Sequence, residues 1–145
     1  MQPVVAALVL TLLLCAGSSH AAEPLPTKEA ARKFADGLLG SVGAGNFGGT
    51  VSQITGAMEL PPSKLKDLEA QLSVVYTNTL VTYGDAIGSE FLRQASVGES
   101  LFRVTYLAKY QRGAIRWNLL FYRGEKGWVL ADVRTDPNLH SLFAE

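Results

Sequence analysis

Residues 101–135 read LFRVTYLAKYQRGAIRWNLLFYRGEKGWVLADVRT, three segments rich in β-branched and aromatic residues that alternate with polar ones. Such alternation is typical of half-buried strands. The two glycine-containing breaks between the segments predict hairpins, so we expect three neighbouring antiparallel strands. One face of this sheet would carry nearly all of the apolar side chains, and an apolar layer must therefore cover it.

The first hairpin is expected to turn at Arg112-Gly113, because glycine supplies the positive φ of a tight turn. This register places Tyr110 opposite Ile115. Every second residue along the two strands from this pair then lies on the same, aromatic face. A slip of one residue would scatter the apolar side chains over both faces of the sheet.

The second hairpin, around residues 124–127, has two possible registers. A tight turn at its two central residues would put Asp132 and Arg134 on the aromatic face. A three-residue loop with Gly127 in a β-bulge keeps both charges out of the core, and we prefer it for that reason. The apolar residues that this second register turns inward are Val129, Ala131 and Val133.

The other face of the sheet is expected to mix leucines and aromatic residues with charges, as partner surfaces do more often than purely solvated ones. We therefore expect a homodimer through this outer face. Its candidate interface residues are Arg103, Arg116, Leu120, Trp128, Leu130 and Arg134.

Helical patterns precede the strands. Thr27 and Asn46 are suitable N-caps for a first and a short second helix, and Pro61-Pro62 opens a third with an apolar stripe. One more strand is expected between residues 83 and 96. This order predicts an α+β fold, with N-terminal helices packed on one face of a curved four-stranded antiparallel sheet.

Several segments stand where one known superfamily has its helix starts and closing strands: Leu60-Pro61-Pro62, Tyr83-Gly84, Gly88-Ser89-Glu90, residues 117–122, Gly127-Trp128 and Val133. Over roughly the whole of residues 22–145, the chain resembles the NTF2-like (cystatin-like, cone-shaped) superfamily. The resemblance implies a pocket between the first helix and the concave sheet, and frequent dimers through the other face. It implies no particular activity, since members include isomerases, dehydratases and transport factors. The chain looks most like small exported members without known chemistry.

The candidate binding residues are Tyr106, Tyr110 and Trp117, whose rings can line a cavity while their polar atoms orient a ligand. Plain core packing is the alternative role for these three residues. We expect a non-enzymatic domain that binds a small apolar ligand or a protein partner. One alternative function is a small isomerase or hydro-lyase, which needs a pocket carboxylate, Asp132 or Asp36. Another is an envelope assembly or inhibitor subunit that uses the exposed sheet.

Residues 1–21 are typical of a secretory signal, with an apolar run at 4–14 and small residues before an expected cleavage at Ala22 or Glu23. The absence of a basic residue before the run is atypical of such signals. The run is too short to span a bilayer, so we expect no stable membrane insertion. The domain at 22–145 would then be periplasmic or secreted, and it would lack cysteine because Cys15 leaves with the signal.

Composition and motifs also argue against several functions. The 13 acidic and 13 basic residues balance, which argues against a nucleic-acid partner. We expect no cofactor and no metal, because His140 lacks partner ligands nearby in the sequence. The G-x-G-x-x-G pattern at 43–48 follows a helix instead of a strand, so it predicts a helix connection and not a dinucleotide site.

Overall fold

The structure is a computed structural model that describes residues 22–144, and the expected signal segment lies outside the described residues. Three helices come first: α1 (Lys28–Gly43), α2 (Phe47–Ala57) and α3 (Pro62–Tyr83). Four strands and a short 3₁₀ helix follow: β1 (Ala86–Val97), β2 (Leu101–Tyr110), β3 (Gly113–Gly124), β4 (Gly127–Asp136) and η1 (Leu139–Phe143). The strands form one open antiparallel sheet in the order β1-β2-β3-β4, which confirms the predicted α+β fold.

The helices begin where the capping residues predict. The Thr27 hydroxyl accepts a hydrogen bond from the Ala30 N–H at 3.0 Å, and the Asn46 side chain accepts one from the Gly49 N–H at 2.9 Å. The glycine-rich pattern at 43–48 is a connection between α1 and α2, as expected. None of the helices in the described part of the chain is long and apolar enough to cross a membrane.

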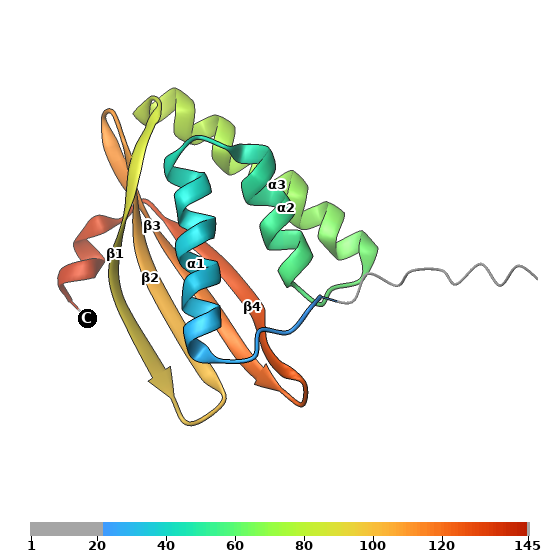
Figure 1. Ribbon diagram of the computed structural model, residues 1–145. Helices are drawn as coiled ribbons and strands as arrows, with labels where there is room; N and C mark the ends of the chain where they lie inside the picture. The colour runs from blue at the N-terminus through green and yellow to red at the C-terminus, as the bar shows by residue number, and fades with distance from the viewer. Residues whose placement is uncertain (1–21, 145) are drawn as a thin grey trace, which may run out of the picture.

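The core lies between the helices and one face of the sheet. Figure 1 shows α1 lying across the sheet, with α2 and α3 beside it. The residues that α1 buries are small or aliphatic, which lets the helix approach β1 and β2 closely. The face that the helices cover is the aromatic face that the alternation predicts: Phe102, Val104, Tyr106, Ala108, Ile115, Trp117, Leu119 and Phe121 are all buried.

The predicted register of the first hairpin is wrong by two residues. Tyr110 pairs with Gly113, so the turn consists of Gln111 and Arg112. Contacts with the end of α3 hold this turn: the Arg112 N–H donates to the Tyr83 carbonyl at 2.8 Å. The Tyr83 ring packs directly on Gly113, where a Cβ would lie 2.4 Å from it. A shift of two residues keeps every side chain on its predicted face, because side chains alternate with a period of two.

The predicted register of the second hairpin is also wrong. Gly124 pairs with Gly127 across a tight turn, so Trp128 and Leu130 point into the core and are only 4% and 1% exposed. Their expected place on the outer face is therefore incorrect, and Val129 and Ala131 point outward instead. The tight turn is favoured because it buries the large apolar side chains of Trp128 and Leu130 in the core.

A bulge in β4 then restores the charges to the outer face. Leu130 pairs with Phe121, but Asp132 pairs with Leu120, so Ala131 is an extra residue in the strand. Beyond this bulge Val133 packs against the core, and Asp132 accepts a hydrogen bond from the Arg134 Nε at 2.7 Å. The strand thus buries apolar residues on both sides of the bulge without burying either charge.

The C-terminal segment covers part of the outer face. The Leu142 carbonyl of η1 accepts a hydrogen bond from Arg93 at 3.5 Å, and η1 packs against β3. Arg116 is buried there and pairs with Asp136 at 2.6 Å. Of the candidate interface residues, Arg103, Leu120 and Arg134 lie on the outer face, whereas Arg116 is enclosed by its own chain.

Candidate functional site

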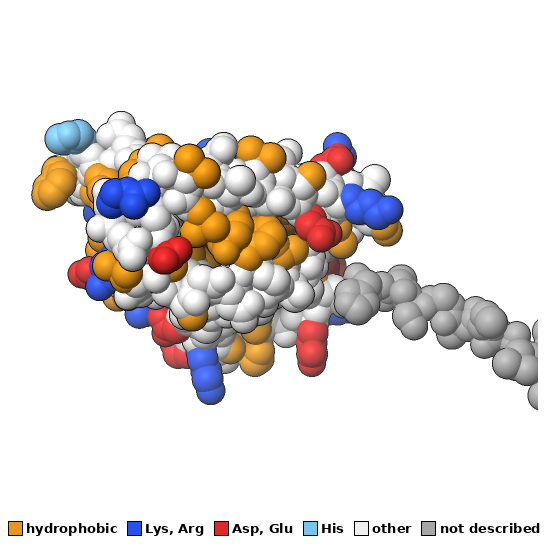
Figure 2. Space-filling model, turned by 90° about the horizontal axis from the view of Figure 1, so that it is seen from above, with side chains coloured by type: hydrophobic (Ala, Val, Ile, Leu, Met, Phe, Trp, Pro, Cys, Tyr) orange, Lys and Arg blue, Asp and Glu red, His pale blue; other side chains and the backbone are white. Residues whose placement is uncertain are grey.

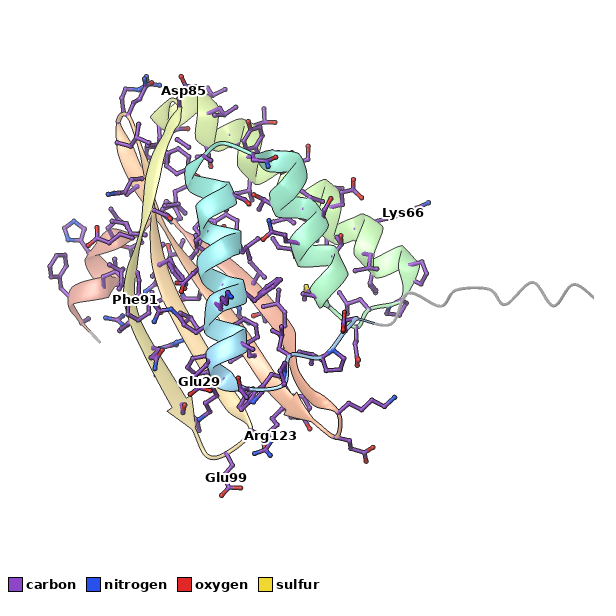
Figure 3. The ribbon with its side chains drawn as sticks, in the orientation of Figure 1. Glu29, Lys66, Asp85, Phe91, Glu99 and Arg123 are labelled. Atoms are coloured by element: carbon purple, nitrogen blue, oxygen red, sulfur yellow. The ribbon has the colours of Figure 1, made fainter. Side chains whose placement is uncertain are left out.

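An apolar cavity lies at the end of the sheet where α1 meets α2. Its lining comes from the α1–α2 connection, from α3 and from the adjoining ends of β1, β2 and β3. Figure 2 views this end of the molecule and shows hydrophobic side chains gathered in a central hollow. In Figure 3, Asp85 marks the same end, whereas Glu99 and Arg123 mark the opposite one. The residues that line the cavity include Val42, Asn46, Phe47, Thr50, Leu72, Val75, Tyr76, Thr79, Leu80, Ala86, Tyr110, Ile115 and Trp117.

The cavity is large enough for a compact small molecule. The space open to the centre of a water-sized sphere is about 40 Å³. One water requires roughly 10–15 Å³ on the same measure. The cavity therefore has room for several water-sized groups, or about one small ring.

Aromatic side chains shape the lining. Phe47 of α2 stacks on Tyr76 of α3, with ring centroids 4.5 Å apart. Tyr110 lies on the sheet side, with its ring centroid 6.4 Å from that of Tyr83. Burial raises the pKa of Tyr110, and the nearby Tyr76 raises it further, so the Tyr110 hydroxyl stays neutral at ordinary pH.

None of the residues that line the cavity is charged. The two threonines of the lining satisfy their hydroxyls within their own helices: Thr50 donates to the Asn46 carbonyl at 2.8 Å, and Thr79 donates to the Val75 carbonyl at 2.7 Å. The arrangement can hold an apolar molecule, but it offers no carboxylate, imidazole or amine to exchange a proton with it.

Two of the three predicted binding residues, Tyr110 and Trp117, line this cavity, whereas Tyr106 does not. The Tyr106 hydroxyl donates to Asp36 at 2.5 Å and accepts from the Arg32 Nε at 3.1 Å. Burial is the main cause that raises the pKa of Tyr106 far above its usual value, and the bond to Asp36 adds to it.

Arg32 connects this tyrosine to the first strand. Its guanidinium lies 3.3 Å from the centre of the Phe91 ring, and Figure 3 marks Phe91 on β1. The Arg32–Asp36 pair is also a salt bridge within α1, at 3.0 Å. Tyr106 therefore ties α1 to the sheet and lies outside the cavity.

The two carboxylates that an enzyme would need do not line the cavity. Asp132 lies on the outer face beside Arg134, and Asp36 is bound to Tyr106 and Arg32 at another place on α1. Within residues 22–144, no three His, Cys, Asp or Glu side chains lie together where they could hold a metal ion.

The predictions from sequence missed the helical half of the lining. Phe47 and Thr50 lie in a glycine-rich segment with little pattern. The α3 residues Val75 and Tyr76 belong to the apolar stripe that predicted the helix, but the stripe indicates only a buried face. A cavity under that face depends on how far α3 stands from the sheet, which no local pattern encodes.

Comparison with known proteins gives a likeness of fold. No family model matches the chain, and no curated protein matches it in sequence. A crystal structure of a DUF4783 family protein from Bacteroides fragilis is similar, with a TM-score of 0.50 and 11% identity, over 70% of this chain and 96% of that one. At this identity the similarity concerns the fold alone.

Two further crystal structures of DUF4783 family proteins give weaker superpositions. The protein from Bacteroides uniformis has a TM-score of 0.49 and 14% identity, over 70% of this chain and 94% of that one. The protein from Bacteroides ovatus has a TM-score of 0.48 and 13% identity, over 68% of this chain and 92% of that one.

Proposed function

We propose that this protein is an exported, NTF2-like, non-enzymatic domain that binds a small neutral apolar molecule in the cavity between α3 and the sheet. The observation that carries the proposal is the lining itself, which is aromatic and aliphatic and contains no charged residue. Ligand sites are commonly concave and mostly apolar, with a few polar groups that fix orientation. Tyr76, Tyr110 and Trp117 supply such groups here.

The cavity favours binding over catalysis. An isomerase or hydro-lyase of this architecture requires a group that takes up or releases a proton next to the substrate. The tyrosines of the lining are the only residues there whose side chains carry an acidic proton, and the raised pKa of Tyr110 keeps its phenol protonated, so that it has no phenolate to accept a proton. Export is the part of the proposal that rests on residues 1–21, and the intact mass of the protein recovered from cells tests it.

Filling the cavity should abolish binding. Ala86 lines the cavity at the start of β1, so Ala86→Phe places a ring in the space that the ligand needs. We expect cyclopentanone to shift amide NMR signals of lining residues in the natural protein, and the variant to lose those shifts while it keeps its circular dichroism spectrum.

The neighbouring Ile87 provides the matched control. Its side chain is 63% exposed and does not line the cavity. Ile87→Phe adds an aromatic ring to the same strand and should leave cyclopentanone binding unchanged. Binding that survives Ala86→Phe, or shifts spread over the whole surface, would argue against the cavity as the site.

We also propose that the protein forms a homodimer through the part of the outer face that η1 leaves open. Val97, Leu101, Tyr122 and Val129 pair in one row across all four strands. Val97 is 71% exposed and Tyr122 is 48% exposed, which is unusual for apolar side chains in a row. The next row contains Arg103 and Asp132, whose opposite signs leave that row without a net charge that would repel a second copy.

Tyr122→Glu should convert this dimer into a folded monomer, because it places like charges at the centre of a self-complementary surface. Light scattering coupled to size-exclusion chromatography measures the mass. Val81→Glu is the control, since Val81 is an exposed apolar residue on α3, outside the row formed by Val97, Leu101, Tyr122 and Val129. A natural protein that is already monomeric would rule out the dimer.

A further inference from the structure

The outer edge of strand β1 differs along its length. Within the described part of the chain, β1 pairs only with β2, so one of its two sides has no neighbouring strand. Its first part is interrupted by two register shifts, the second of them between Phe91 and Arg93. Its last part, residues 94–97, pairs with β2 without a break. Bulges disturb pairing at an edge, so only this last part is a regular template for a further strand.

Residues 94–97, Gln-Ala-Ser-Val, contain none of the features that usually protect an edge strand. They include no charge, proline or glycine, and all four are exposed. Alternate residues of an antiparallel strand direct their N–H and C=O groups away from the neighbour. None of the hydrogen bonds of turns, loops and caps in the described residues involves this segment. Figure 1 shows β1 at the margin of the sheet, where these backbone groups are open to a partner.

The opposite edge of the sheet is partly covered. Leu25 pairs with Trp128 of β4 through two backbone hydrogen bonds, of 2.7 and 2.8 Å. The N-terminal segment therefore protects the start of β4, whereas no segment of the described residues takes this role at the end of β1. This difference indicates that the end of β1 is an edge that another strand can extend.

The α1 side of this edge is mainly basic. A hollow between α1 and β1 is lined by three basic residues, Lys28, Arg32 and Lys33, and by two acidic ones, Glu29 and Asp36. Asp36 already accepts hydrogen bonds from Arg32 and Tyr106. Lys28 reaches β1 itself, where its Nζ donates to the Ser96 hydroxyl at 3.1 Å. An inward-facing side chain of an added strand would lie beside this lysine, so a negative charge is favoured there.

The other side of the edge is apolar. Val97 is 71% exposed and ends the outer-face row that also contains Leu101, Tyr122 and Val129. An outward-facing side chain of an added strand would continue this row, so an aliphatic residue fits there. The proposed dimer packs through the face of the sheet, and it leaves the backbone groups at this edge unpaired.

We infer that residues 94–97 bind an extended segment of another protein, which adds to β1 as a further strand. Its acidic side chains face α1 and alternate with aliphatic ones that face outward. Backbone hydrogen bonds then supply affinity, and the alternate side chains supply specificity. A second copy of β1 is less suitable, because a two-fold axis between Ala95 and Ser96 would bring the Lys28 side chains of both copies together. This inference does not depend on the cavity.

The probe is the peptide Val-Glu-Val-Glu-Val with both ends blocked. At millimolar concentration, we expect it to shift the amide NMR signals of residues 94–97 and to slow hydrogen exchange of those amides that face the edge. The amide signals of β4 should stay in place, because that strand lies at the opposite edge. Val-Lys-Val-Lys-Val should bind more weakly, since its cations would lie beside Lys28.

N-methylated peptides test strand addition directly. In an added strand, the valines direct their N–H groups to one side and the glutamates direct theirs to the other, because both patterns have a period of two. One peptide is methylated on its valine nitrogens and a second on its glutamate nitrogens, so both keep their side chains and charge. We expect only one of the two to lose binding. Equal binding of the two methylated peptides would overturn strand addition.

Lys28→Glu tests the position of the acidic side chains. Glutamate suits the first turn of a helix, so the variant should fold. We expect Val-Glu-Val-Glu-Val to bind about two- to fivefold more weakly to it at low salt. Lys66→Glu is the matched control, since it makes the same change of charge on α3, and Figure 3 shows Lys66 far from β1. Equal weakening in both variants would overturn the placement of the acidic side chains beside α1.

Two further results would contradict the inference. Concentration-dependent shifts of the residue 94–97 amides in the protein alone would assign this edge to a second copy and overturn the acidic partner. A complete lack of response of these amides to Val-Glu-Val-Glu-Val would overturn the docking site itself.

Discussion

Replacing Gly43 by alanine should destabilise the protein, although alanine is the better helix former. A Cβ at position 43 would lie 2.6 Å from the Gly88 carbonyl carbon and 2.8 Å from the Ser89 nitrogen. Both atoms belong to the β1 backbone, so relief requires α1 to move away from the sheet. Overpacking of this kind costs about 1–3 kcal/mol, which outweighs a gain in helix propensity of up to about 1 kcal/mol.

Gly40→Ala in the same helix is the matched control. An added Cβ there meets nothing within 4 Å, so only the propensity gain of up to about 1 kcal/mol remains. The midpoint of urea unfolding measures both variants, with a fall expected for Gly43→Ala and a rise for Gly40→Ala. A rise for both would mean that α1 and β1 are not in contact at Gly43.

Leu130→Glu should largely unfold the protein, whereas Ala131→Glu should be tolerated. Leu130 is almost fully buried, and the substitution removes a core side chain and places a carboxyl group in its position. Loss of a buried leucine costs about 2–5 kcal/mol, and burial of a carboxyl group adds several more. The total is comparable to the whole stability of a domain of this size, about 5–15 kcal/mol.

Ala131 follows directly in the chain, but it is exposed at the bulge of β4. Glutamate at this position should change the free energy of unfolding by no more than about 0.5 kcal/mol. Thermal unfolding followed by circular dichroism compares the two variants. The opposite result would support the three-residue loop at Gly127, which turns Ala131 inward and Leu130 outward.

The candidate site was predictable only in part. Tyr110 and Trp117 were identified because aromatic residues on the covered face of a sheet are the usual walls of a pocket. Tyr106 occupies an equivalent position in the alternation, yet it is bound to Asp36 and lies outside the cavity. The difference depends on which part of α1 passes over each residue, and that contact joins positions 70 residues apart.

The composition of the outer face was also predicted only in part. The prediction that leucines and aromatic residues mix with charges there holds for Arg103, Leu120 and Tyr122. It fails for Trp128 and Leu130, because the turn and the bulge of the last hairpin reverse the direction of those two side chains. The burial of Arg116 was not visible either, since its partner Asp136 lies on the next strand.

Local patterns were sufficient for the fold class, the helix starts and the membership of the aromatic face. Helix caps are hydrogen bonds between residues three positions apart, and a hairpin shift of two residues leaves each side chain on the same face of the sheet. Neither prediction therefore depends on contacts between distant segments. The hairpin registers, the bulge at Ala131 and the cavity beneath α3 depended on packing between distant segments. Several registers satisfy the same alternation. Close packing decides among them, because each register brings a different set of side chains into contact over the whole interface.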